Sequence, residues 1–293
     1  MLLAIINYAD DNTPFTSAPS IPNVIQNLEE DSKNLLNWLR YHGLKANPDK
    51  FHMLLSEPDE SLSMKIDGYV ISNSISQKLL GIVFDSKLNF KAHVSNLCTI
   101  ASQKLHALSR ISNYMTLQQR KIIMKSFILS QFGYCPLVWM FHSRKLNNRI
   151  NNIHERALRL VFQDNYSSFD FLLKKDNSFT IHKRNIQTLA IELYKVAYRI
   201  SPQIMRLVFP SKIKDAQYPW NDIFKTFNVK TVYWGTETLS HIGPKIWTII
   251  PQPLKKLSSY KKFRKAIRLW DPKECPCRMC KYYLHGVGFI NVT

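Results

Sequence analysis

The chain has 293 residues, 45% of them hydrophobic and 12% aromatic, so it can bury a core and does not have the composition of a disordered polymer. No apolar run approaches the roughly 18 residues that a membrane span requires, and the apolar start Met1–Ile6 lacks the basic leader of a signal peptide. We therefore expect an intracellular protein, nuclear or cytoplasmic, without a membrane partner.

The net charge of +19 is unevenly distributed along the chain. Residues 1–90 hold 7 Lys and Arg against 11 Asp and Glu, a net charge of −4, whereas residues 91–293 hold 33 against 10, a net charge of +23. A polyanion relieves the self-repulsion of so concentrated a charge, and nucleic acid is the expected one. A membrane surface is a weaker candidate, and a soluble basic surface without a specific partner is the remaining alternative.

The first 90 residues have the pattern of an α+β region. The apolar run Leu2–Ile6 predicts a buried strand, and Asn7–Asn12 predicts a hairpin turn with two aspartates at its tip. Pro22 marks the first turn of a helix that ends at His42-Gly43. Short strands are expected at three further places: Phe51–Ser56, Met64–Ile66 and Leu79–Phe84.

From about Phe90 the hydrophobic period becomes helical. The strongest helices are expected at Asn96–Tyr114, Leu117–Phe132, Arg144–Phe162, Ile181–Arg199 and Tyr260–Trp270. The third of these helices, Arg144–Phe162, carries a basic stripe beside its apolar stripe: Lys145, Arg149, Arg156 and Arg159. The last helix, Tyr260–Trp270, is rich in Lys and Arg. Val229–Trp234 alternates like a strand, and Cys98 and Cys135 lie in apolar stretches expected to join the core.

Tyr8-Ala-Asp-Asp11 is the first motif that indicates a specific chemistry. Nucleotide transfer uses two divalent metal ions held by carboxylates, and adjacent aspartates on a tight hairpin can bind both ions. In this setting the four residues resemble motif C of reverse transcriptases. A chance acidic turn is the alternative explanation of the motif taken by itself.

The following residues extend the resemblance to LINE-type, non-LTR retrotransposon reverse transcriptases. Asn34–Leu39 with Gly43–Lys50 is similar to motif D, and Lys78–Asp85 is similar to the primer-grip hairpin of motif E. Met115–Leu129, Asn151–Leu158, Tyr233–Ser240 and Gly243–Trp247 look like the later parts of jockey-like open reading frames.

The resemblance implies roles for individual residues. Asp10 and Asp11 would bind Mg²⁺, and Lys50 would protonate the leaving pyrophosphate, unless it is an ordinary solvated lysine. Tyr8 and Gly81 would contact substrate, since a glycine in an apolar strand lets backbone approach a primer end closely. The implied partners are an RNA template and a DNA primer.

Motif A, which supplies the other metal-binding aspartate in these enzymes, precedes motif C, and only seven residues precede Tyr8 here. The fingers and motif B also belong upstream. We therefore expect these 293 residues to be a truncated polymerase that is inactive alone.

Three cysteines near the C-terminus form a second candidate site. Cys275, Cys277, Cys280 and His285 offer three thiols and an imidazole, which are ligands that tetrahedral Zn²⁺ prefers. Their spacing is cramped compared with most zinc fingers. Three reduced cysteines in a basic tail are the alternative.

The sequence thus predicts three parts of an α+β protein. Residues 1–90 would be a partial polymerase palm with motifs C, D and E, residues 91–200 a helical thumb and connector, and residues 201–293 a basic region with a Cys/His tail. The predicted function is that of a fragment of an RNA-directed DNA polymerase. The alternative is a non-catalytic nucleic-acid-binding protein that uses the basic region alone.

Overall fold

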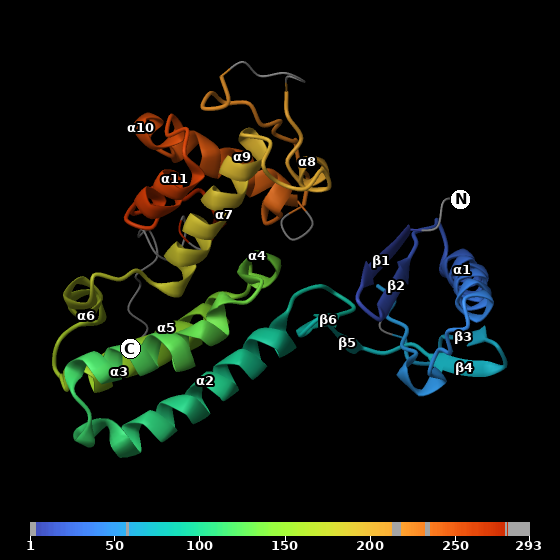
Figure 1. Ribbon diagram of the computed structural model, residues 1–293, viewed down its shortest axis with the longest axis horizontal. Helices are drawn as coiled ribbons and strands as arrows, with labels where there is room; N and C mark the ends of the chain where they lie inside the picture. The colour runs from blue at the N-terminus through green and yellow to red at the C-terminus, as the bar shows by residue number, and fades with distance from the viewer. Residues whose placement is uncertain (1–3, 57–58, 213–217, 232–234, 279, 281–293) are drawn as a thin grey trace. The chain divides into compact units, whose positions relative to one another are not determined.

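The computed structural model describes residues 4–56, 59–212, 218–231, 235–278 and 280 (Figure 1). It divides into two compact units, Met1–His93 and Val94–Thr293, each of which is described by itself below. The expected α+β class is confirmed, with mostly helices and small antiparallel hairpins. None of the helices in the described ranges is long and apolar enough to cross a membrane.

The described residues of the first unit form three two-stranded antiparallel hairpins. Their strands are β1 (Ala4–Tyr8) with β2 (Asp11–Phe15), β3 (Ser63–Ile66) with β4 (Tyr69–Ser72), and β5 (Ser76–Leu79) with β6 (Ile82–Asp85). Two of the turns, Asp67-Gly68 and Leu80-Gly81, have positive φ at both residues, which is typical of type I′ hairpin turns. In the β1–β2 turn, Ala9 has a φ of 52°.

Helix α1 (Ile21–Tyr41) packs its apolar side chains against the core of the first unit. Ser20 caps its first turn by accepting a hydrogen bond from Asn23 N, and Pro22 stands at its start. Arg40 near its end forms an ion pair with Asp67 in the β3–β4 turn. The buried core side chains come from α1, β3, β4 and the segment before β3: Leu36, Met53, Leu55, Met64, Ile66 and Ile71.

Three strand predictions in this unit are corrected. Leu79–Phe84 is the turn region of the β5–β6 hairpin, because Leu80-Gly81 reverses the chain. Phe51–Ser56 makes only an isolated bridge, between Met53 and Asn73. The first strand forms, but its described part is not buried, since Ile6 is 52% exposed. Within the described residues β1 pairs with β2 alone, and a two-stranded sheet cannot bury both of its faces.

The first half of the second unit is a set of packed helices. They are α2 (Lys91–Ile111), η2 (Ser112–Tyr114), α3 (Leu117–Ile123), η3 (Met124–Ile128), η4 (Leu129–Gly133), α4 (Pro136–Trp139), α5 (Arg144–Phe162) and α6 (Phe169–Asp176). The predicted bounds of α5 are confirmed, because Ser143 caps its start and Gln163, with a φ of 51°, ends it. The predicted helix Leu117–Phe132 instead changes from α to π to 3₁₀ winding. Figure 1 shows α2 alongside α5, where Arg149 donates to Thr99 Oγ1 at 3.2 Å.

The second half of this unit is built around α7 (Ile181–Ala197), which packs against α9 (Leu239–Ile249) and α11 (Tyr260–Ile267). Two short helices, α8 (Met205–Val208) and α10 (Gln252–Lys255), complete it. Trp247 is buried and donates from Nε1 to Asn221 O at 2.8 Å. The strand expected at Val229–Trp234 does not form over Val229–Thr231, and its remaining residues lie outside the described ranges.

Candidate functional site

The two aspartates of the Tyr8–Asp11 motif lie at the β1–β2 turn. Asp10 is in the turn itself, and Asp11 begins β2, where it pairs with Tyr8. Both carboxylates are exposed, and in the described part of the chain neither forms an ion pair. Asn12 Nδ2 donates to the backbone carbonyl of Asp10 at 3.3 Å, so this bond does not use the carboxylate. Two adjacent oxygen ligands of this kind suit Mg²⁺.

The other predicted polymerase residues lie on separate elements of the first unit. Lys50 ends the 3₁₀ helix η1 (Pro48–Lys50) with its side chain exposed, and Tyr8 is exposed at the end of β1. Gly81 lies in the β5–β6 turn with a φ of 84°, rather than inside a strand as the sequence predicted. Over the described ranges, no hydrogen bond or ion pair joins Asp10 or Asp11 to Lys50.

A complete two-metal site needs more carboxylates than this hairpin supplies. Among the described residues, the sole group of three or more acidic, His or Cys side chains with metal-site spacing lies in the second unit. No third carboxylate therefore joins Asp10 and Asp11 within those ranges.

That group is formed by His182, Cys275, Cys277 and Cys280. One ligand atom from each residue lies within 4.8 Å of the others, and all four side chains are buried. His182 Nε2 is 3.3 Å from Cys277 Sγ and 3.3 Å from Cys280 Sγ. Three sulfurs and one imidazole nitrogen form a donor set typical of structural zinc sites.

The predicted zinc ligands are therefore brought together in part. The three cysteines converge, whereas His285 lies outside the described residues and the described histidine of the cluster is His182. Sequence spacing carried no signal for His182, because it precedes Cys277 by 95 positions. A histidine in the first turn of a helix, next to a buried Ile181, otherwise looks like an ordinary core residue.

The thiols influence one another electrostatically. The hydrogen bond between Cys275 and Cys277 lowers the pKa of the Cys277 thiol and raises that of Cys275, while hydrogen bonds with Cys275 and Cys277 raise the pKa of Cys280. The backbone N–H of Cys280 also donates to Cys277 Sγ at 3.4 Å.

The other two cysteines have separate environments. Cys98 is fully buried in α2, as expected, and burial raises its thiol pKa to about 11. Cys135 was expected in the core but is exposed; it lies at the turn before α4, where its φ is 40°. Neither belongs to the metal-ligating cluster.

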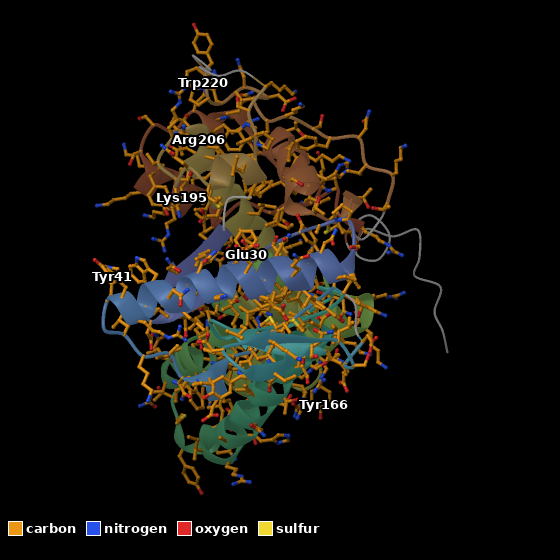
Figure 2. All side chains as sticks on the ribbon, turned by 90° about the vertical axis from the view of Figure 1, so that its right-hand side faces the viewer. Glu30, Tyr41, Tyr166, Lys195, Arg206 and Trp220 are labelled. Carbon is orange, nitrogen blue, oxygen red and sulfur yellow. The ribbon has the colours of Figure 1, made fainter. Side chains whose placement is uncertain are left out.

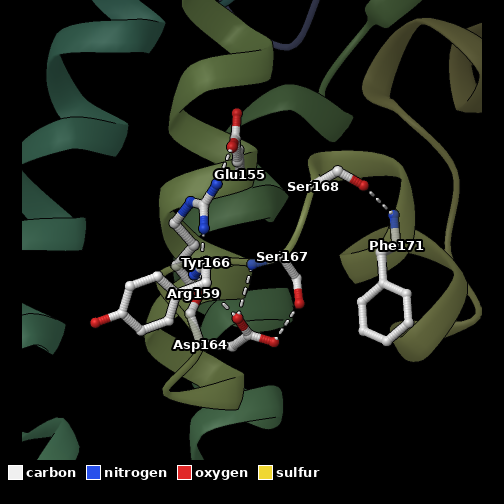
Figure 3. A network of polar contacts seen from close by, with 7 residues as sticks. All are labelled: Glu155, Arg159, Asp164, Tyr166, Ser167, Ser168 and Phe171. Carbon is white, nitrogen blue, oxygen red and sulfur yellow. Dashed lines mark hydrogen bonds and ion pairs between the residues drawn. The ribbon is translucent and has the colours of Figure 1, made fainter.

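The predicted basic stripe of α5 is only partly available to a ligand. Lys145, Arg149 and Arg156 are exposed. Arg159 is half-buried and turned toward Glu155, to which it donates at 2.6 Å, and it also donates to Asp164 O (Figure 3). Asp164 in turn accepts from the backbone and hydroxyl of Ser167, so this arginine stabilises the turn between α5 and α6.

Helix α11 presents a denser set of cations. Its exposed face carries Lys261, Lys262, Arg264 and Lys265, while Phe263 and Ile267 are buried against α7. Exposed tyrosines occur on both units. Tyr41 projects from the end of α1 (Figure 2), and Tyr166 in the α5–α6 turn is 100% exposed. Cations and exposed aromatic rings are the side chains with which proteins bind phosphates and stack unpaired bases.

Comparison with known proteins finds distant relatives. The chain is 23% identical over 210 residues to the probable RNA-directed DNA polymerase from transposon BS of Drosophila melanogaster, covering 69% of this chain and 22% of that protein. It is 24% identical over 162 residues to the RNA-directed DNA polymerase from mobile element jockey of the same species, covering 54% of this chain and 18% of that protein.

The matched region spans about a fifth of the length of these curated relatives. No protein-family profile matches the chain, and no solved structure matches it. The chain is distantly similar, over part of its length, to the RNA-directed DNA polymerases of Drosophila non-LTR retrotransposons.

Proposed function

We propose that the chain is the C-terminal part of a non-LTR retrotransposon reverse transcriptase. The observation that carries the proposal is the partial similarity to two RNA-directed DNA polymerases. The hairpin position of Asp10 and Asp11 agrees with it, since motif C requires its aspartates at a turn. In this proposal residues 1–90 belong to the palm, residues 91–200 to the thumb and connector, and residues 201–293 to a basic C-terminal region.

In this function Asp10 and Asp11 bind Mg²⁺, which activates the attacking 3′ oxygen and neutralises the leaving phosphates when it is bound. Both carboxylates are exposed and outside any ion pair of the described residues, so no internal contact has to break first. Lys50 donates a proton to the leaving pyrophosphate. Tyr8 and the backbone at Gly81 contact the template–primer.

The proposed site requires a third carboxylate on a strand beside β1. Within the described residues β1 pairs with β2 alone, and Ile6 and Phe15 are each 52% exposed, so the hairpin offers an apolar surface and a free strand edge for it. We therefore expect the 293 residues by themselves not to extend a primer. A palm segment that supplies the missing carboxylate restores the activity.

Primer extension on an RNA template in the presence of Mg²⁺ tests this proposal. The 293-residue chain is assayed alone and fused behind the upstream palm and fingers of the transposon BS polymerase. We expect extension only by the fusion, with a loss of at least about 100-fold in Asp10→Ala and Asp11→Ala, since each removes a metal ligand. Glu30→Ala, in an exposed acid on the middle of α1 (Figure 2), is the matched control that keeps activity. Extension that survives both aspartate substitutions would contradict the proposal.

A second candidate function, binding of nucleic acid without catalysis, is favoured by the charge of +23 over residues 91–293. The exposed cations of α5 and α11 would contact phosphates, and Tyr166 would stack on unpaired bases. If about five phosphates are contacted, log K should fall against log salt with a slope of roughly −3.5 to −4.5.

Filter binding of single-stranded RNA by the whole chain at several salt concentrations tests the second candidate. Replacing Lys261, Lys262 and Arg264 by Gln should make the slope shallower by about 0.7 for each cation that contacts a phosphate. Lys33→Gln, in the acidic first unit, is the control that leaves the slope unchanged. Affinity that does not depend on salt would rule out binding through phosphates.

A further inference from the structure

We propose that His182, Cys275, Cys277 and Cys280 bind one structural Zn²⁺ ion, which fastens the C-terminal segment to the first turn of α7. The site is argued from these residues alone and does not depend on the polymerase assignment. It replaces His285 with His182 as the fourth ligand of the zinc site that the sequence suggested.

The geometry of the four donors supports a single tetrahedral ion. Zinc–sulfur bonds of about 2.3 Å and zinc–nitrogen bonds of about 2.0 Å place tetrahedral ligand atoms roughly 3.5 to 4 Å apart. The donor atoms here lie within 4.8 Å of one another, and His182 Nε2 is 3.3 Å from two of the sulfurs. Small side-chain movements therefore suffice to complete the coordination.

The burial of the three cysteines and His182 favours a bound metal ion over free thiols. His182, Cys275, Cys277 and Cys280 are all at most 4% exposed, and the cysteines belong to the same buried cluster as Trp247 and Phe263. Without a metal ion, the three thiols and the imidazole form only weak hydrogen bonds with one another inside this apolar core, because a thiol is a weak donor and a weak acceptor. A zinc ion would convert these weak contacts into coordinate bonds, because zinc binds thiolate sulfur strongly.

The neighbouring contacts hold the two segments in place for such a site. Lys183, next to His182, forms an ion pair with Asp271 at 2.8 Å. One turn further along α7, Gln187 Nε2 donates to Trp270 O at 2.8 Å and to Arg268 O at 3.3 Å. These bonds fix the chain just before Cys275 against the helix that carries His182. The ligands are therefore positioned by the fold before metal arrives.

A disulfide is the competing chemistry. Three cysteines at this spacing permit one disulfide, which would leave a third thiol and His182 without a use. All three cysteines are free in the structure. Zinc uses all four donors at once, and it links residues separated by 95 and 98 positions, so that it closes a long loop of the chain.

The test is metal analysis of the full chain purified under reducing conditions. We expect about one zinc per chain by mass spectrometry of the metal, and a lower melting temperature after removal by a chelator. His182→Ala and Cys280→Ser should weaken zinc binding by more than about 100-fold, beyond the 10–100-fold effect of an outer-shell change. His285→Ala and Cys135→Ser are the controls that should retain the metal.

Conservative replacement separates loss of a ligand from loss of the fold. His182→Cys should restore binding, and with Co²⁺ in place of zinc its sulfur-to-metal absorption should be stronger than in the wild type, because a fourth thiolate is added. Retention of zinc by His182→Ala together with its loss in His285→Ala would overturn the proposal. A wild-type chain that takes up no zinc, or that contains a disulfide under these conditions, would also overturn it.

Discussion

The two units differ in what they leave exposed. Within the described residues of the first unit, each sheet has two strands, the core is small, and the candidate site residues Asp10, Asp11 and Lys50 are exposed. In the second unit, many polar side chains are buried among helices, including His154, His182, Asn185 and Asp176. The candidate site residues of the first unit are therefore exposed, whereas those of the second unit, His182 and the three cysteines, lie inside its core. Each prediction below tests one side of this contrast.

The largest expected effect concerns a histidine in the core of the second unit. His154 of α5 is fully buried and packs edge-on against Phe169 at 5.5 Å between ring centroids. Burial and, to a smaller extent, the charge of Arg184 lower its pKa to about 4, against the opposing effect of the Asp176 carboxylate. The folded chain therefore keeps His154 neutral until the pH approaches 4.

The sign of the pH dependence follows from this depressed pKa. The unfolded chain binds a proton at His154 near pH 6.5, whereas the folded chain does so only near pH 4. Between these values the unfolded state binds more protons, so the free energy of unfolding falls as the pH falls. We expect His154 to contribute a loss of about 1.4 kcal/mol per pH unit, and about 3 kcal/mol over the whole window.

Urea unfolding followed by circular dichroism at several pH values measures this effect. The variant His154→Leu should lose stability less steeply than the wild type as the pH falls from 6.5 to 4. His106→Leu, in an exposed histidine of α2, is the matched control and should keep the wild-type slope. Equal slopes for all three proteins would mean that His154 is protonated in the folded state.

The helices were the most predictable part of the fold. Helix α5 forms over the expected range because Ser143, the apolar period and Gln163 all specify the same bounds. Residue pattern alone predicted one strand over Leu79–Phe84, although Lys78–Asp85 resembles a hairpin, because Leu80 adopts a φ of 47°, a conformation that leucine does not signal. Turns marked by Asp-Gly, such as Asp67-Gly68, carry that signal, whereas Leu-Gly does not.

The candidate sites divide in the same way. Asp10 and Asp11 are adjacent in sequence, so their position at one turn could be predicted from local residues. His182 and the cysteines could not be grouped in advance, because the packing of α7 against the C-terminal segment brings them together. Local patterns reveal sites made by one turn, while sites made by packing require the tertiary structure.

Glycine-to-alanine substitutions are expected to have smaller effects, and they compare the packing of the two units directly. Gly243 lies in α9, where an added Cβ would collide with the ring of Phe209, 2.9 Å from its Cδ1, and would lie 3.2 Å from Leu193 Cδ2. Both neighbours are buried, so neither can move away freely. We expect Gly243→Ala to destabilise the second unit by about 2 kcal/mol through overpacking. Gly133→Ala has open space around the new methyl group and should be close to neutral.

In the first unit the cost of an added methyl group arises in the backbone instead. Gly68 has a φ of 81°, and a Cβ added there would meet no atom within 4 Å, so Gly68→Ala causes strain without a clash. A left-handed conformation costs an L-residue roughly 1 to 2 kcal/mol, and we expect about 1 kcal/mol here.

Hydrogen exchange should show faster opening of β3 and β4 in Gly68→Ala, with the amides of α7 and α9 unchanged. In Gly243→Ala the pattern should reverse, because the strain then lies in the packed core. Faster exchange in α7 of Gly68→Ala would mean that the two units unfold together, and a larger cost of Gly68→Ala than of Gly243→Ala would mean that backbone strain outweighs overpacking; either result would contradict the contrast.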